Sequence, residues 1–185
     1  MSTLKVDTIL KRTGTGTITL GQSGDTIALG SGASQTLAAN TPSFTATLTS
    51  DTSISDDTVT LIPCDSELFD TDNAYDNTAG NYKFTPQVAG KYFVFVYAQA
   101  NASSGQGGDF NAYIYKNGSQ IHVSEYNFTD GAASRLSASA SSIVDMNGST
   151  DYIQGYVLSN VFSGTPTLKA DTNKKTRFGA FRILT

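Results

Sequence analysis

The chain has 185 residues, a net charge of −4 and only 15% charged residues, where about 25% is usual for globular proteins. Its Lys and Arg residues are scattered, which argues against a nucleic-acid partner, and no apolar run is long enough to span a membrane. The first residues lack the long apolar stretch of a secretion signal, so we expect the protein to be made and assembled in a cytoplasm.

The N-terminal part carries a weak repeat with a step of nine residues: Thr-Ile recurs at 8–9, 17–18 and 26–27. Each copy is a strand too short to bury a face alone, so the repeat predicts a stalk stabilised by stacking or by other chains. The alternative is a flexible Gly/Ser linker, but a linker has no reason to keep Ile and Leu in register. We divide the chain into a docking peptide (1–12), a Gly/Thr-rich repeat stalk (13–40) and one domain (41–185).

The domain reads as a series of β-strands separated by turns. No segment shows helical periodicity, and strands at this spacing predict an all-β sandwich or barrel. The Asn117-Gly118 pair between alternating segments predicts a hairpin with a type I′ turn. Residues 50–80 hold eight acids and no base, which we interpret as exposed loops around short strands. The expected strands cover residues 44–48, 59–62, 91–98, 110–116, 119–127, 134–144, 152–161 and 176–184.

The strongest strand is predicted at Lys91–Ala98, and both of its faces are apolar. One face carries Tyr92, Val94 and Val96, and the other carries an aromatic series, Phe93, Phe95 and Tyr97. A strand with one solvated face alternates apolar and polar residues, so this strand should be covered on both sides. We expect the core on one side and a neighbouring subunit on the other.

The sequence offers no catalytic constellation. It has one histidine, His122, and one cysteine, Cys64, which cannot build a triad or a His-based metal site, and we expect no enzyme activity and no cofactor. Asp70-Thr71-Asp72-Asn73 alternates oxygen ligands but lacks the later Gly and Glu of a calcium loop, which leaves only a loose calcium site open. Glycoside hydrolysis would need an acid held in an apolar pocket, which a crowded loop does not supply.

Three short motifs resemble C1q/TNF-like domains. The segment Phe84–Tyr92 matches the pattern Phe, five residues, Gly, one residue, Tyr, although Val94 and Val96 stand where that family usually has aromatic residues. Lys116-Asn117-Gly118 matches the family's hairpin, and Phe178–Leu184 resembles its final strand. The resemblance covers about residues 43–185. It implies a jelly-roll β-sandwich that packs as a homotrimer, and we assign the subunit contact to Phe93, Phe95 and Tyr97.

The N-terminal phrases resemble the start of bacteriophage fibre and virion surface proteins, in which an N-terminal peptide docks on the particle. The resemblance implies a virion structural protein, a trimeric fibre or a capsid-decorating (cement) protein, with Leu4, Val6 and Ile9 as apolar anchors on other virion proteins. We therefore expect the protein in the virion, assembled in the host cytoplasm.

The alternative function is a tail-fibre tip module that binds a host glycan or protein receptor. Rigid β-scaffolds commonly present binding loops, and the acidic region and the Gly-rich segment before Phe110 are candidates for them. The residues nominated for these tip loops are Asp70, Asp72, Tyr75 and Gly107.

Overall fold

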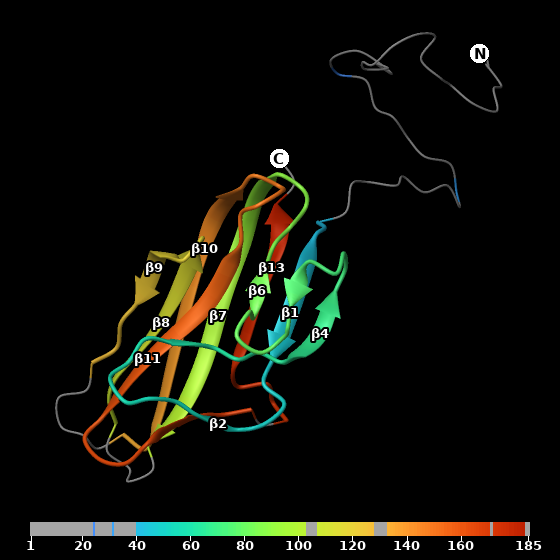
Figure 1. Cartoon of the computed structure of the whole chain (residues 1–185). Helices are drawn as coiled ribbons and strands as arrows, with labels where there is room; N and C mark the ends of the chain where they lie inside the picture. The colour runs from blue at the N-terminus through green and yellow to red at the C-terminus, as the bar shows by residue number, and fades with distance from the viewer. Residues whose placement is uncertain are drawn as a thin grey trace, which may run out of the picture. The chain divides into compact units, whose positions relative to one another are not determined.

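In the computed structural model of the chain, the described residues are 24, 31, 40–102, 107–127, 133–170 and 172–183. Their strands form two antiparallel sheets packed face to face as a β-sandwich, which confirms the predicted fold class (Figure 1). The predicted docking peptide (1–12) and nearly all of the stalk (13–40) lie outside the described residues.

Each sheet has a continuous order of strands. The first sheet runs β2 (Thr52–Ser53), β12 (Pro166–Leu168), β7 (Gly90–Ala102), β13 (Arg177–Ile183), β1 (Ser43–Thr47), β4 (Ser66–Asp70), with β10 (Arg135–Met146) also paired to β7. The second sheet runs β5 (Tyr75–Asp76), β6 (Lys83–Phe84), β11 (Ile153–Val161), β8 (Gly107–Lys116), β9 (Ser119–Ser124), with β3 (Thr60–Leu61) also paired to β11.

The predicted long strand is β7, the centre of the first sheet. It pairs with β10 over its length on one side and with β13 and β12 on the other. Tyr92, Val94 and Val96 point into the sandwich and are at most 1% exposed, as predicted for the core face. Because successive side chains of a strand point to opposite faces, the intervening aromatic residues lie on the outer face of the first sheet.

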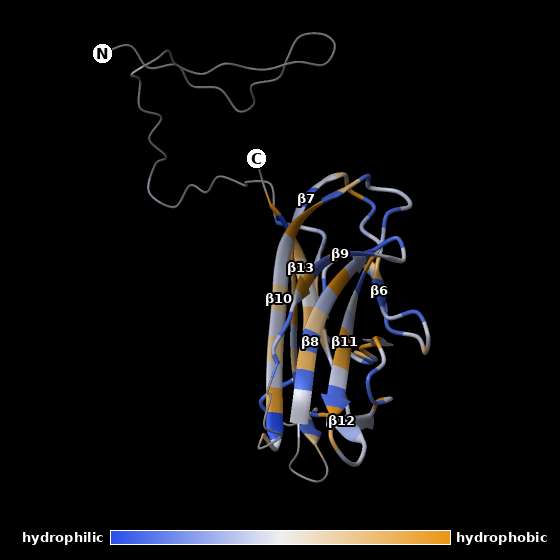
Figure 2. Cartoon of the chain, turned by 90° about the vertical axis from the view of Figure 1, so that its left-hand side faces the viewer, coloured by the Kyte–Doolittle hydropathy of each residue, from blue (hydrophilic) through white to orange (hydrophobic). Residues whose placement is uncertain are grey.

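Aromatic residues from both sheets build one end of the core. The ring of Phe44 in β1 stacks on those of Tyr75 and Phe84 at 4.5 Å and meets Phe178 edge-on at 5.0 Å. Apolar and polar positions interleave along β8 and β11, which is the pattern of strands with one face in a core (Figure 2).

Two Asn-Gly turns lie in connections between consecutive strands. Asn117 and Gly118 have φ angles of 51° and 77°, and positive values at both positions are those of the predicted type I′ hairpin between β8 and β9. The second turn follows β10 and contains Gly148, with φ of 72°.

The region 50–80 is more regular than the sequence indicated. It contains β2, β3, β4 and β5, and β4 pairs with β1 across a register shift between Thr45 and Ala46. Strands of two to five residues show too little alternation to be distinguished from loops in the sequence. No helix among the described residues is long and apolar enough to cross a bilayer.

Candidate functional site

The outer face of the first sheet carries a cluster of large apolar side chains from four strands. In strand register, Ile143 of β10 lies beside Phe93 of β7, which lies beside Phe181 of β13. A second row passes from Phe95 across Gly179 and Thr45 to Phe69 of β4. We call this set the aromatic face; its members are Phe69, Phe93, Phe95, Tyr97, Ile143 and Phe181.

The aromatic face is packed within the chain but still open to solvent. Phe93 contacts Phe181 with ring centroids 5.4 Å apart, and it contacts Phe95 at 6.4 Å. Ile143 remains 60% exposed, Phe69 51% and Phe181 39%. A soluble monomer rarely exposes a contiguous apolar patch of this kind, so the face has the character of an interaction surface.

Charged groups border the aromatic face at both ends. At one end Lys91 Nζ donates to Asp145 Oδ1 at 2.7 Å. Toward the other end the guanidinium of Arg177 lies over the ring of Tyr97, with Cζ 5.5 Å from the ring centroid. An apolar centre with a polar rim is the usual anatomy of a protein interface.

The predicted subunit-contact residues therefore share one surface. Phe93, Phe95 and Tyr97 are half-buried on it, and coverage of this surface by another chain stays a prediction. The sequence did not assign Phe69, Ile143 and Phe181 to it. Their apolar character was visible, but only the pairing of β10, β13 and β4 places them beside β7.

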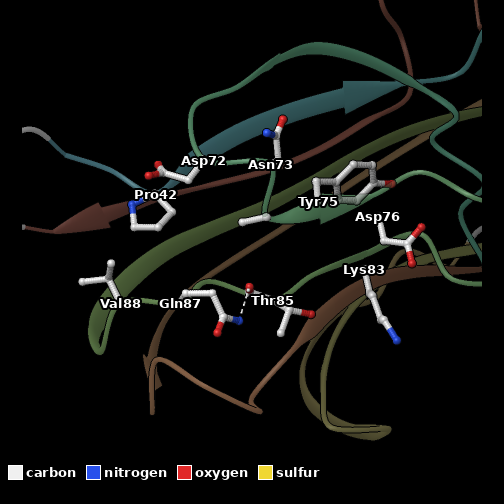
Figure 3. A pocket seen from close by; sticks show the side chains of 10 residues that line it. Pro42, Asp72, Asn73, Tyr75, Asp76, Lys83, Thr85, Gln87 and Val88 are labelled. Atoms are coloured by element: carbon white, nitrogen blue, oxygen red, sulfur yellow. Dashed lines mark hydrogen bonds between the residues drawn. The ribbon is translucent and has the colours of Figure 1, made fainter.

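A cavity of about 410 Å³ opens where β1 begins and where the segment between β4 and β5 faces the segment after β6 (Figure 3). The backbone N–H of Thr85 donates to Ala74 O at 2.7 Å and joins the two segments beside the paired strands β5 and β6. The lining residues are Pro42, Asp72, Asn73, Ala74, Tyr75, Asp76, Lys83, Thr85, Gln87 and Val88.

Asp70 organises the loop that forms one wall of this cavity. Its carboxylate accepts the backbone N–H of Tyr75 at 2.8 Å and that of Asp72 at 3.2 Å. The backbone N–H of Thr71 donates to Ser43 O at 3.0 Å and ties the loop to β1. Asp70 is thus a structural residue of the loop, whereas Asp72 is exposed on the cavity wall.

The prediction of Tyr75 as an exposed tip-loop residue is wrong. Its side chain is 5% exposed, its ring stacks on Phe44, and its hydroxyl donates to Cys64 O at 2.8 Å. Burial raises the pKa of Tyr75, with a smaller contribution from the nearby Cys64. The polar residues around Tyr75 predicted an exposed loop, but the ring packs in the core and keeps this residue buried.

Gly107 is also not a tip-loop residue. It is buried as the first residue of β8, and a Cβ at this position would lie 2.6 Å from Cδ1 of Leu136. The backbone N–H of Gly107 donates to Ala133 O. The next residue, Ser134, accepts the N–H of Ala102, at the end of β7, with its backbone oxygen. Asp70 is in a different part of the first sheet: it pairs with Phe44 of β1, in the same cross-strand row as Val94 near the middle of β7, whereas Gly107 lies near the end of β7. The structure therefore does not bring the predicted tip-loop residues together.

The residues considered for chemistry lie on separate elements. Cys64 is buried, and desolvation raises the pKa of its thiol, so it stays neutral in the core. His122 is half-buried on β9, opposite Ile114. Within the described ranges, no three His, Cys, Asp or Glu side chains are grouped as a metal site would require.

Asp76 and Lys83 form an oppositely charged pair across β5 and β6 at the edge of the cavity. Hydrogen bonds from the hydroxyl and backbone N–H of Thr78 hold the pKa of Asp76 below its usual value, and Asn81 adds a further bond at 2.6 Å. The Lys83 ammonium also lies over the ring of Tyr152, with Nζ 5.4 Å from its centroid.

Comparisons with solved structures identify the fold. Murine APRIL at pH 5.0 matches with a TM-score of 0.56 and 10% identity, over 76% of this chain and 98% of that one. The globular domain of zebrafish complement 1qA protein matches with a TM-score of 0.54 and 13% identity, over 77% and 98%. Eiger TNF from S. frugiperda matches with a TM-score of 0.51 and 11% identity, over 77% and 90%.

The domain is therefore a C1q/TNF-like jelly-roll β-sandwich, as the sequence motifs indicated. No protein-family model matches the chain, and no curated protein matches it in sequence. At this level of identity the likeness shows the fold alone.

Proposed function

We propose that the protein is a homotrimeric structural protein of a bacteriophage virion, either a fibre or a capsid-decorating protein, attached through its N-terminal arm. The observation that carries the assembly part is the aromatic face, where Ile143, Phe69 and Phe181 are 39–60% exposed in the isolated chain. Covering such a surface removes apolar area from water and favours association.

Three copies are proposed by analogy with the fold, since C1q/TNF-like domains typically form homotrimers and are typically non-catalytic. The inner face of the same sheet is already filled by the core, so the outer face is the one left for a neighbour. The first sheet carries large apolar residues on both faces. A monomer would leave its outer apolar face exposed to solvent.

The virion part of the proposal is supported by the sequence of the N-terminal arm. Leu4, Val6 and Ile9 are the proposed apolar anchors; the polar residues Lys5, Asp7 and Thr8 lie between them, and the nine-residue repeat begins at Thr8-Ile9. Burying each of these side chains on a particle would contribute about 1.5–3 kcal/mol, which three arms of a trimer would multiply.

The oligomeric part is tested by sedimentation equilibrium of the full chain. A mass three times the 19.5 kDa of one chain is expected. A monomer at all concentrations up to the millimolar range would contradict the homotrimer.

Attachment is tested with the combined substitutions Leu4→Ser, Val6→Ser and Ile9→Ser in the phage. Particles should lose the protein, while the purified variant keeps the mass of the unmodified protein. A matched control replaces the intervening polar residues, Lys5→Ala, Asp7→Ala and Thr8→Ala, and should be incorporated normally. Apolar-substituted protein that remains on particles would refute docking by these residues, and the copy number per particle distinguishes capsid decoration from a fibre.

A second candidate function, a module that binds a host receptor or glycan, is favoured by one observation. The cavity beside β5 and β6 has the volume of a small-ligand site, and Asp72, one of the nominated residues, lines it.

A further inference from the structure

The cavity beside β5 and β6 has hydrogen-bonding groups that the fold does not use. Among the described residues, the side chains of Asn73 and Thr85 make no hydrogen bond, and Gln87 uses only its Nε2, which donates to Thr85 O and Ser149 O. The carboxylate of Asp72 is bonded only by the neighbouring Thr71 hydroxyl, at Oδ2. Figure 3 shows Asp72 and Asn73 on one of the lining segments and Thr85 and Gln87 on another.

The same cavity is also lined by apolar side chains. Ala74, Pro42 and Val88 line it together with the buried Tyr75. Ligand sites of about 300–1,000 Å³ commonly combine such surfaces with a few polar groups that fix orientation, and the 410 Å³ here falls in that range.

The charges around the cavity offset one another. Asp76 and Lys83 lie opposite each other on β5 and β6, and the guanidinium of Arg182, which donates to Ala89 O beside Val88, balances the carboxylate of Asp72. A phosphate or carboxylate therefore gains no net attraction here. Within the described residues no three carboxylate, His or Cys side chains are grouped here to hold a metal ion, and a solvent-exposed carboxylate attracts an organic cation only weakly.

We infer that this cavity binds a neutral saccharide unit. Sugar hydroxyls both donate and accept hydrogen bonds. The Asp72 carboxylate and the Gln87 Oε1 can accept from them. The Asn73 amide and the Thr85 hydroxyl can both donate to them and accept from them. The C–H faces of a pyranose ring match the apolar lining at Ala74 and Val88. None of the lining residues belongs to the aromatic face, so this site is separate from the proposed subunit contact.

The test is saturation-transfer NMR and calorimetric titration of the full chain with glucose, galactose, mannose, N-acetylglucosamine, maltose and lactose. At least one of them should bind, at millimolar strength. Two variants locate the site: Thr85→Val removes one hydroxyl at constant shape and should weaken binding about fivefold. Ala74→Leu fills the cavity and should abolish binding.

Gln120→Met on β9, an exposed glutamine outside the cavity, is the matched control and should bind like the unmodified chain. Circular dichroism spectra confirm that each variant is folded, and Thr85→Val keeps the test decisive should Ala74→Leu fail to fold. The inference is overturned if none of the six saccharides binds. It is also overturned if Thr85→Val binds as tightly as the unmodified chain, or if N-acetyl-lysine amide binds and the saccharides do not. Saccharide binding is measured independently of the oligomeric state. A chain that binds a saccharide but sediments as a monomer would therefore contradict only the proposed homotrimer.

Discussion

The ring of Phe95 in β7 lies directly over Gly179, its register partner in β13. A Cβ at Gly179 would stand 2.5 Å from Cζ of Phe95 and 2.9 Å from the backbone oxygen of Phe44. Only glycine fits here, and its missing side chain lets the aromatic ring lie flat across the sheet. The shape of the aromatic face therefore depends on this position.

Gly179→Ala should push Phe95 off the sheet and destabilise the fold by about 1–3 kcal/mol, because an added methyl in a close-packed contact forces its neighbours to shift. Urea denaturation followed by circular dichroism measures the loss. Adding Phe95→Leu removes the far end of the ring and should recover part of it. A Gly179→Ala variant as stable as the original would show that the ring moves without cost.

Ile143→Ser tests the aromatic face as a subunit contact. Ile143 is 60% exposed in the single chain, so the stability of the monomer should hardly change, whereas each subunit contact should weaken by about 1–2 kcal/mol. Sedimentation equilibrium over a dilution series should show dissociation at higher concentration. Ile121→Ser on β9, 43% exposed on the other sheet, is the control and should leave the mass unchanged. Equal behaviour of the two variants would argue against the assigned contact.

Asp151 joins the two Asn-Gly turns and should make stability depend on pH. It accepts bonds from Lys116 Nζ at 2.8 Å, Asn117 Nδ2 at 2.8 Å and the backbone N–H of Asn147 at 3.0 Å. The bond from Lys116, followed by that from Asn117, lowers the pKa of Asp151 below its usual value. A carboxyl whose pKa is lower in the folded state stabilises the fold above its unfolded pKa of about 3.9.

This contribution is lost as pH falls through the folded pKa of Asp151. Asp151→Asn should therefore lower the urea midpoint at pH 7, and the difference from the unmodified chain should shrink as the pH falls below the unfolded pKa of about 3.9. Asp145→Asn is the control, because the Asp145–Lys91 pair is exposed to solvent and should contribute little. A difference for Asp151→Asn that stays constant with pH would refute the charge-based explanation.

Gly148 and Gly80 separate two costs of replacing a glycine. Both have positive φ, 72° and 88°, but a Cβ at Gly148 would lie 2.2 Å from Ala89 N, whereas nothing lies within 4 Å at Gly80. Gly80→Ala should cost about 1 kcal/mol from backbone strain, and Gly148→Ala should cost about 3 kcal/mol or more because the turn is pushed off the segment before β7. Thermal denaturation of both variants measures the difference, and similar losses would show that the close approach at Gly148 is relaxed easily.

The core side of β7 could be predicted from the sequence because alternation along a strand assigns side chains to faces. Tyr92, Val94 and Val96 share one face by their spacing alone, and a strand apolar on both faces is unusual enough to be noticed. The turn at Asn117-Gly118 was equally readable, since its two residues tolerate the positive φ that the hairpin requires.

The candidate sites were predicted only in part. Phe93 and Phe95 could be placed on the outer face, but Ile143 and Phe181 join them through the register of β10 and β13, which come from distant parts of the chain. The cavity likewise depends on the pairing of two very short strands, β5 and β6, at Tyr75 with Phe84 and at Asp76 with Lys83. Nothing in the local sequence indicates this pairing.

The sequence by itself thus determined an all-β domain, the two faces of its long strand and the tight turn of its clearest hairpin, since these follow from local alternation and backbone preferences. The tertiary structure decided that Tyr75 lies in the core, that Gly107 is packed under Leu136, and which distant residues complete the aromatic face and the cavity. These features depend on strand register and on the packing of one sheet against the other, and both arise from contacts between residues far apart in the chain.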